Sequence, residues 1–166
     1  LGGNNLARHI ENVKSFGVPV VVAINRFITD TDAEIQAVKD LASENGVKAI
    51  ECTHWSNGGK GTTELAEEVV KLAHSGVASF APLYPNDMAI WDKIKTVATR
   101  LYRADDIIAD KKIRAQIRKI EDDGYAHFPI CIAKTQYSFS TDPNLKGAPN
   151  NHVMAIREVR LSAGAG

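Results

Sequence analysis

Two aromatic side chains, Phe27 and Trp55, have the positions that most favour a binding function. Each closely follows an apolar, strand-like run, residues 18–24 for Phe27 and residues 47–51 for Trp55. Ligands of open parallel sheets bind beyond the carboxyl ends of the strands. Two rings on neighbouring loops could therefore sandwich a flat heterocycle, by area burial and stacking geometry. The alternative is that both rings pack beneath their loops, because large apolar side chains usually belong to a core.

Polar residues accompany these rings. Asn25 and His54 stand in the same two loops, and a third loop with Lys134 and Thr135 follows the apolar run 128–133. We expect the three loops to converge at one edge of the sheet, so these four residues are candidates to line the cleft. A lysine at such a place is more often a solvated strand-end residue.

The turn Gly58-Gly59-Lys60-Gly61 resembles a phosphate-binding loop only superficially. It does not match G-x-x-x-x-G-K-[ST], since the glycines have the wrong spacing. Gly58 and Gly59 could let the backbone approach a ligand closely, or could form a plain flexible connection. Both readings stay open at this point.

The remaining polar residues form no recognisable catalytic set. The five histidines have no metal-ligand spacing, so no metal site is predicted. No Ser/His/Asp or Cys/His arrangement can be assembled, and the catalytic residues stay unknown. Asp30 and Asp32 are best explained as favourable charges near a helix N-terminus, and Asp105-Asp106 as a solvated connection.

Composition narrows the class of protein. The 166 residues carry 20 basic and 20 acidic side chains, which gives no basic excess for nucleic acid. No apolar run approaches the roughly 20 residues of a membrane span, and no signal-peptide pattern is present. Cys52 and Cys131 have no paired spacing and are expected to be reduced thiols. The expected location is cytoplasmic.

Apolar runs alternate with amphipathic helical stretches, which predicts an α/β fold with a mostly parallel sheet and helices on both faces, Rossmann-like in type. The run 18–24 reads as an interior strand buried on two sides. Thr31 and Glu34 have the spacing of a capping box at the start of a helix. The remaining predicted elements are a strand at 47–51, helices from 62 or 63, from 86 or 87 and over 111–123, and strands at 128–133 and 152–161. We predict one α/β domain over 1–133, with 134–166 continuing it or leading into the next.

The ends of the chain suggest a piece of a larger multi-domain enzyme. The sequence begins with Leu1 and stops at "SAGAG", directly after a strand-like run. Neither end has the character of a natural terminus.

Four long stretches resemble formate–tetrahydrofolate ligase, including the synthetase part of the trifunctional folate enzyme. They are "NLARHIENVKSFGVPVVVAINRFITDTDAEI", "CTHWSNGGKG", "FPICIAKTQYSFSTDPNLKGAP" and "REVRLSAGAG". They occur in the order of the family and span essentially the whole chain.

The resemblance implies a function and a site. The family forms formyl phosphate from formate and ATP, and the N10 amine of tetrahydrofolate then attacks it. By the matches to "INRF" and "CTHW", Phe27 and Trp55 correspond to the aromatic residues that flank the folate ring system. The family enzyme is about three times as long as this chain, since it has several domains, and its phosphate-binding loop lies in an N-terminal portion not matched here. MgATP, a monovalent cation and a homotetramer are expected of the full-length enzyme, and this segment alone is expected to be inactive.

Two other functions compete with this one. The chain could be a non-catalytic α/β interaction or assembly domain, whose exposed apolar patches would favour association. A generic nucleotide-binding domain ranks last, because G-x-G-x-x-G and the phosphate loop are both absent from the sequence.

Overall fold

A computed structural model describes residues 2–133 and 138–164, and the chain forms two compact units, Gly2–Ala81 and Pro82–Gly166. The predicted domain boundary after residue 133 stays a prediction. Strand β4 (Val153–Ala155) pairs in parallel with β3 (Asp106–Ile108), and so joins the C-terminal segment to the unit that precedes it.

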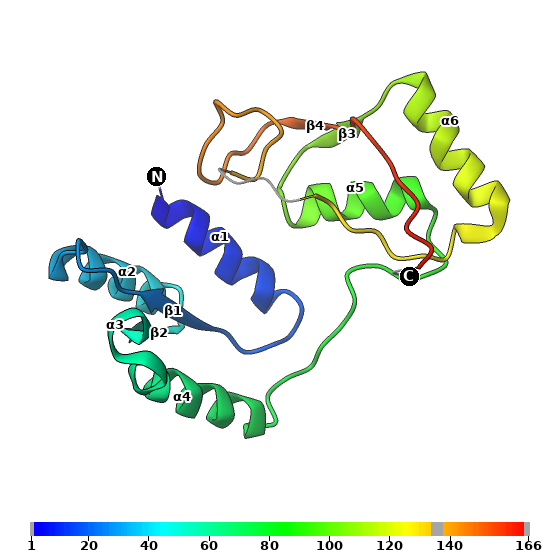
Figure 1. Ribbon diagram of the computed structural model, residues 1–166. Helices are drawn as coiled ribbons and strands as arrows, with labels where there is room; N and C mark the ends of the chain where they lie inside the picture. The colour runs from blue at the N-terminus through cyan, green and yellow to red at the C-terminus, as the bar shows by residue number, and fades with distance from the viewer. Residues whose placement is uncertain (1, 134–137, 165–166) are drawn as a thin grey trace. The chain divides into compact units, whose positions relative to one another are not determined.

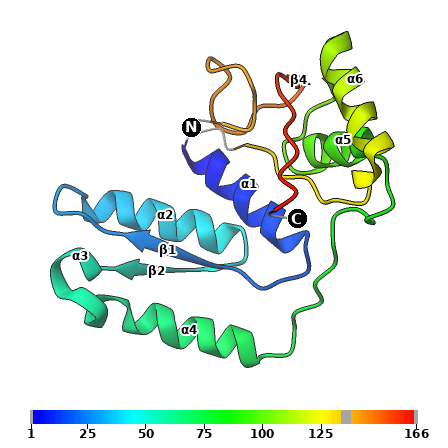
Figure 2. The same ribbon diagram turned by 45° about the vertical axis from the view of Figure 1, so that its right-hand side comes forward.

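The first unit is built on two parallel strands. β1 (Val21–Asn25) pairs with β2 (Lys48–Cys52), and the register places Asn25 beside Cys52. Helix α2 (Asp32–Glu44) connects them, and α4 (Thr63–His74) follows β2. These two helices lie on opposite sides of the strand pair (Figure 2). The predicted α/β class, with parallel strands and helices on both faces, is confirmed.

The start and end of α2 follow from local chemistry. The Thr31 hydroxyl accepts from the Glu34 backbone N–H at 3.3 Å, and the Glu34 carboxylate accepts from the Thr31 N–H at 2.9 Å. The predicted capping box is thus confirmed. Gly46 follows the helix with φ +66°, a left-handed conformation that glycine adopts without strain.

The surroundings of β1 differ from the prediction of a strand buried on two sides. Ile24 is buried, whereas Ala23 and Asn25 are exposed. Among the described residues, β1 has one strand neighbour, β2. Helix α1 (Gly2–Lys14) was not predicted, and its buried Ile10 adds to the core of this unit.

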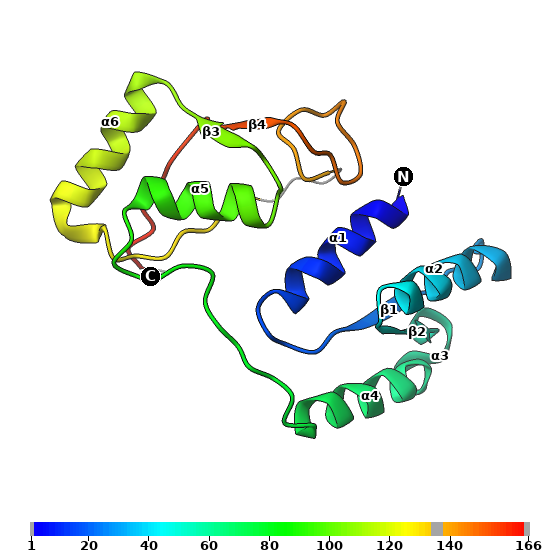
Figure 3. The ribbon, with the colours of Figure 1, turned by 180° about the vertical axis from the view of Figure 1, so that it is seen from behind.

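The second unit packs its helices around the β3–β4 pair (Figures 1 and 3). Helix α5 (Ile90–Arg100) lies against β3, and α6 (Lys111–Ile120) continues into one wider turn, η2 (Glu121–Tyr125). The core consists of buried apolar side chains from both helices, both strands and the connection between α5 and β3, namely Ile90, Ile94, Ala98, Ala104, Ile107, Ile113, Ile117 and Met154.

Two of the predicted strands in this unit are wrong in whole or part. Residues 128–133 are not a strand; the Ile130 N–H instead donates to the Tyr84 hydroxyl at 3.0 Å. The strand expected over 152–161 is limited to Val153–Ala155. An apolar run becomes a strand only where a neighbouring strand completes its hydrogen bonds, and β3 is the partner that the described residues supply to β4.

Smaller differences concern α5 and β3. The helix begins at Ile90 rather than near residue 86 or 87. Asp106, expected in a solvated connection, begins β3 and pairs with Lys95 at 3.0 Å, which lowers the pKa of the carboxyl. No helix within the described ranges is long and apolar enough to cross a bilayer.

Candidate functional site

The carboxyl ends of β1 and β2 lie side by side. Asn25 is the register partner of Cys52, and the Arg26 N–H extends the ladder by donating to the Cys52 carbonyl at 3.0 Å. The chain therefore leaves both strands at one edge of the sheet, and the loops with Phe27 and Trp55 start as neighbours. The geometry predicted for these two loops is present.

A network of charges holds the loop after β1. The Arg26 guanidinium donates to Glu51 at 3.0 Å and to Asp32 at 2.5 Å. These hydrogen bonds, the one with Glu51 first, raise the pKa of Arg26, and the bond from Arg26 lowers the pKa of Glu51. The Arg26 side chain therefore stabilises the loop after β1 through these two carboxylates.

Phe27 itself is fixed through its backbone. Its N–H donates to the Asp30 carboxylate at 2.8 Å, and its carbonyl accepts from the Asp30 N–H at 3.1 Å. Asp30 therefore closes the turn, whereas Asp32 lies in the first turn of α2 as expected. The ring is 52% exposed.

Trp55 belongs to α3 (His54–Asn57), a single helical turn directly after β2. The Thr53 carbonyl accepts from the Ser56 N–H at 3.1 Å and from the Asn57 N–H at 2.9 Å. The Asn57 side chain also donates to the Thr53 hydroxyl at 3.0 Å. The indole is 66% exposed, so this tight turn holds a large ring in solvent.

Both aromatic residues are exposed in this chain. Phe27 is 52% and Trp55 is 66% exposed, so neither is buried beneath its loop here, and their role in binding stays a prediction. In the described part of the chain, the ring–ring contacts are between other aromatic residues, and none links Phe27 with Trp55. Contact of an aromatic ring with water is unfavourable in the free protein. A flat molecule that binds over the ring removes this surface from water and so gains free energy.

The other candidates are partly brought to this edge. Asn25 ends β1 and His54 begins α3, and both are exposed. Gly58 and Gly59 open the short 3-10 helix η1 (Gly58–Thr62), and their predicted approach to a ligand stays a prediction. Lys134 and Thr135 lie outside the described residues, and their predicted place in the cleft stays a prediction.

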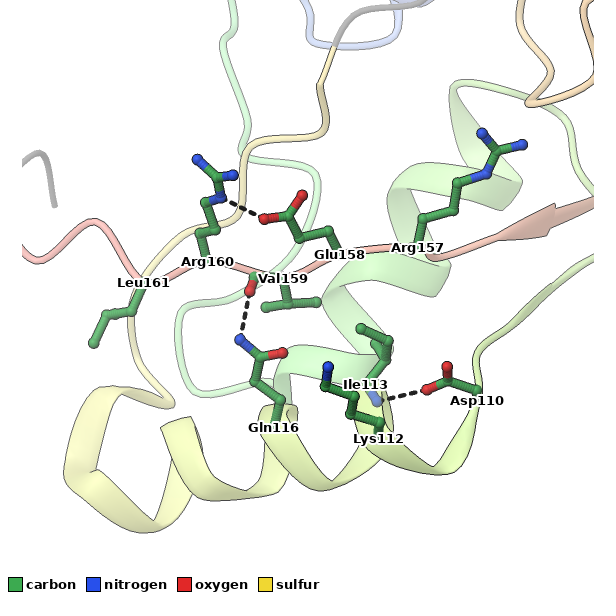
Figure 4. A pocket seen from close by; sticks show the side chains of 9 residues that line it. All are labelled: Asp110, Lys112, Ile113, Gln116, Arg157, Glu158, Val159, Arg160 and Leu161. Atoms are coloured by element: carbon green, nitrogen blue, oxygen red, sulfur yellow. Dashed lines mark hydrogen bonds and ion pairs between the residues drawn. The ribbon is translucent and has the colours of Figure 1, made fainter.

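Two hollows lie in the second unit. One, of about 690 Å³, separates α6 from the segment 157–161 (Figure 4). Several of its polar groups pair with one another: Gln116 donates to the Val159 carbonyl at 2.6 Å, and Arg160 donates to Glu158 at 2.5 Å. A larger apolar hollow of about 830 Å³ includes residues 128–133 in its wall. Neither shows the convergent acids, bases or nucleophiles of a reaction centre.

The two cysteines and the possible metal ligands are further groups that could contribute chemistry at this edge. Cys52 is buried in β2 and Cys131 is exposed, and both are free thiols. In the two described ranges, no three His, Cys, Asp or Glu side chains converge as metal ligands.

Lys93 is a feature that sequence reasoning missed. It is fully buried in α5, and its ammonium donates to the carbonyls of Asn86, Ala126 and Phe128 at 2.7, 2.7 and 3.0 Å. Burial lowers the pKa of Lys93, against the opposing charges of Asp87 and Glu121. The sequence contained one signal for this burial: Lys93 lies beside Ile90 and Ile94 on the apolar face of the helix.

Fold and site together define a segment of an α/β protein that presents two aromatic rings at the carboxyl edge of parallel strands. Comparison with known proteins then gives the family: the model for formate–tetrahydrofolate ligase matches residues 1–166. The chain belongs to the formate–tetrahydrofolate ligase family.

The curated relatives agree. Proteins named formate–tetrahydrofolate ligase from Ruegeria pomeroyi, Sinorhizobium fredii and Granulibacter bethesdensis are 61%, 59% and 56% identical over 99% of this chain. The chain spans about 30% of the length of these relatives.

Proposed function

We propose that this chain is the folate-side segment of the ATP-dependent ligase that joins formate to tetrahydrofolate and gives 10-formyltetrahydrofolate. The observation that carries the proposal is the presence of two rings, each more than half exposed, just beyond two register-paired strand ends. The names of the relatives supply the substrates, formate and tetrahydrofolate. Phe27 and Trp55 would hold the flat ring system of the folate.

The chemistry places a specific demand on these rings. The N10 amine attacks the carbonyl carbon of formyl phosphate, a C–N bond forms, and the C–O bond to phosphate breaks as the amine loses its proton. Holding the folate in one orientation makes this attack effectively intramolecular. Hydrogen bonds fix the backbone of both turns, so less backbone ordering is left to oppose binding.

The described residues do not fit the triphosphate of ATP. The glycine turn is a 3-10 helix without the P-loop spacing, and residues 2–133 and 138–164 contain no group of three His, Cys, Asp or Glu side chains that could hold a metal ion. MgATP is therefore assigned to other parts of the full-length enzyme. The monovalent cation, the homotetramer, the cytoplasmic location and the inactivity of the isolated segment are further proposals from the resemblance.

Replacing Trp55 tests the proposal. In the full-length ligase, Trp55→Ala should raise KM for tetrahydrofolate and lower kcat/KM roughly 5- to 150-fold, which corresponds to a loss of about 1–3 kcal/mol of binding free energy. KM for ATP should change little. Phe27→Ala should act in the same direction.

The matched control is Trp91→Phe. Trp91 belongs to the second unit, where its ring lies 4.1 Å from the Arg114 guanidinium, and phenylalanine retains a ring for that contact. Unchanged folate kinetics in Trp55→Ala, or an equal effect of Trp91→Phe, would refute the stacking role.

A non-catalytic assembly domain is the second candidate. Val69 and Val70 on α4 are 48% and 54% exposed, and such apolar positions favour association. Sedimentation of the isolated chain, with tetrahydrofolate titrated against its Trp fluorescence, separates the two. Self-association without a folate response would favour assembly.

A further inference from the structure

The loop that carries Trp55 is closed by one backbone contact. Thr53, directly after β2, donates its N–H to the carbonyl of Gly61 at 3.0 Å. The residues between them form α3 and η1, so this hydrogen bond seals the base of a compact loop. Trp55 lies on that loop, two residues from the seal.

Gly61 allows this closure because it has no side chain. A Cβ at Gly61 would lie 2.5 Å from the Thr53 carbonyl carbon, 2.6 Å from the His54 nitrogen and 2.8 Å from the Thr53 oxygen. All three atoms are backbone, so no side chain can turn aside to relieve the overlap. They belong to the peptide that joins Thr53 to His54, immediately before Trp55.

The neighbouring glycines are under different constraints. A Cβ at Gly59 would meet nothing within 4 Å, and its backbone has no positive φ. Gly58 also has open space, but its φ of +56° with ψ −147° suits glycine alone. The absence of a side chain is therefore required at Gly61 and not at Gly59, although both glycines belong to one turn.

We infer that Gly61 is a positioning residue for Trp55, because its missing side chain lets η1 close on the Thr53–His54 peptide and so fixes the direction of α3. The inference rests on the proposed folate-binding role of Trp55. A side chain at Gly61 would push this peptide away. The Thr53 carbonyl, which holds the Ser56 and Asn57 N–H groups, would move with it. The indole would then leave the orientation that stacking requires.

The test compares Gly61→Ala with Gly59→Ala in the full-length ligase. Gly61→Ala should raise KM for tetrahydrofolate about tenfold or more, since small misplacements have large kinetic effects. KM for ATP should stay near wild type. Gly59→Ala, which adds the same methyl group in open space on the same turn, should raise KM for tetrahydrofolate much less than Gly61→Ala.

A double-mutant cycle separates positioning from general damage. If Gly61 acts through Trp55, Gly61→Ala should add almost nothing to KM for tetrahydrofolate in a Trp55→Ala background. Should Gly61→Ala fail to fold, Asn57→Ala replaces it in the cycle. Asn57 is exposed, and the variant loosens the same turn by removing its bond to the Thr53 hydroxyl. Its effect should be smaller and should also vanish without Trp55.

The outcomes distinguish this inference from the function on which it rests. If Trp55→Ala raises KM for tetrahydrofolate while Gly61→Ala behaves like Gly59→Ala, the positioning role is wrong and the folate role stands. An effect of Gly61→Ala that persists at full size without Trp55 also overturns it. If Trp55→Ala changes nothing, the proposed function itself fails.

Discussion

The two units of this chain use the same element, a pair of short parallel strands, in opposite ways. Beyond β1 and β2, the chain turns tightly and presents large rings to solvent. Around β3 and β4, it buries an ammonium, that of Lys93, among backbone carbonyls. The first arrangement leaves apolar surface for a ligand to cover, whereas the second satisfies its polar groups internally. The proposed function therefore rests on the loops that follow β1 and β2 rather than on the strands themselves.

The largest effect is expected from removing the buried ammonium of Lys93. Lys93→Met keeps an unbranched apolar stem but removes the ammonium, which leaves three carbonyls without their donor at a cost of about 3 kcal/mol or more. Amide hydrogen exchange in α5 and residues 126–130 of the full-length enzyme should show a matching loss of protection. KM for tetrahydrofolate should stay near wild type in the folded fraction.

Lys95→Met is the control for this change. Lys95 lies two residues further along the same helix, is partly exposed, and pairs with Asp106 at 3.0 Å. Surface pairs contribute about 0–1 kcal/mol. Equal losses of protection in the two variants would show that the buried network around Lys93 does not stabilise this unit as described.

A smaller effect on stability is expected from the ion pair between Arg26, the residue before Phe27, and Glu51. The hydrogen bond from Arg26 lowers the pKa of Glu51 below its ordinary value of 4.5. A carboxyl whose pKa is lower in the folded state stabilises the fold above its unfolded pKa. That stabilisation is lost as pH falls through the lower, folded value. Glu51→Gln should therefore lower the thermal midpoint at pH 7, with a loss of at most about 1 kcal/mol, and the difference should disappear in acid.

Glu67→Gln, which alters an exposed carboxylate on α4, is the comparison. A pH dependence for Glu51→Gln no different from that of Glu67→Gln would contradict the role given to the Arg26–Glu51 pair.

Local chemistry explains which features of this fold could be predicted. The capping box at Thr31 and the strand before Phe27 depend on neighbouring residues, and both are present. The run 128–133 has the composition of a strand, but pairing depends on a partner that local sequence does not specify. Helix α1 begins with Gly-Gly-Asn-Asn, which has low helix propensity, and packing of Ile10 stabilises it.

The site shows the same division. The neighbouring strand ends followed from the order of the parallel strands, and the two aromatic positions from their place after those strands. The tight closure at Gly61 could not be foreseen, because it depends on atoms eight residues away in the chain that only the folded turn brings into contact.

Fluorescence offers the most direct test of the central claim, that folate stacks on Trp55. Tetrahydrofolate would be titrated into the full-length ligase and into its Trp55→Phe variant, which keeps a ring at the site. We predict a saturable quench in the parent that is largely absent from the variant at folate concentrations that saturate both. Quenching of equal amplitude in both proteins would contradict the claim.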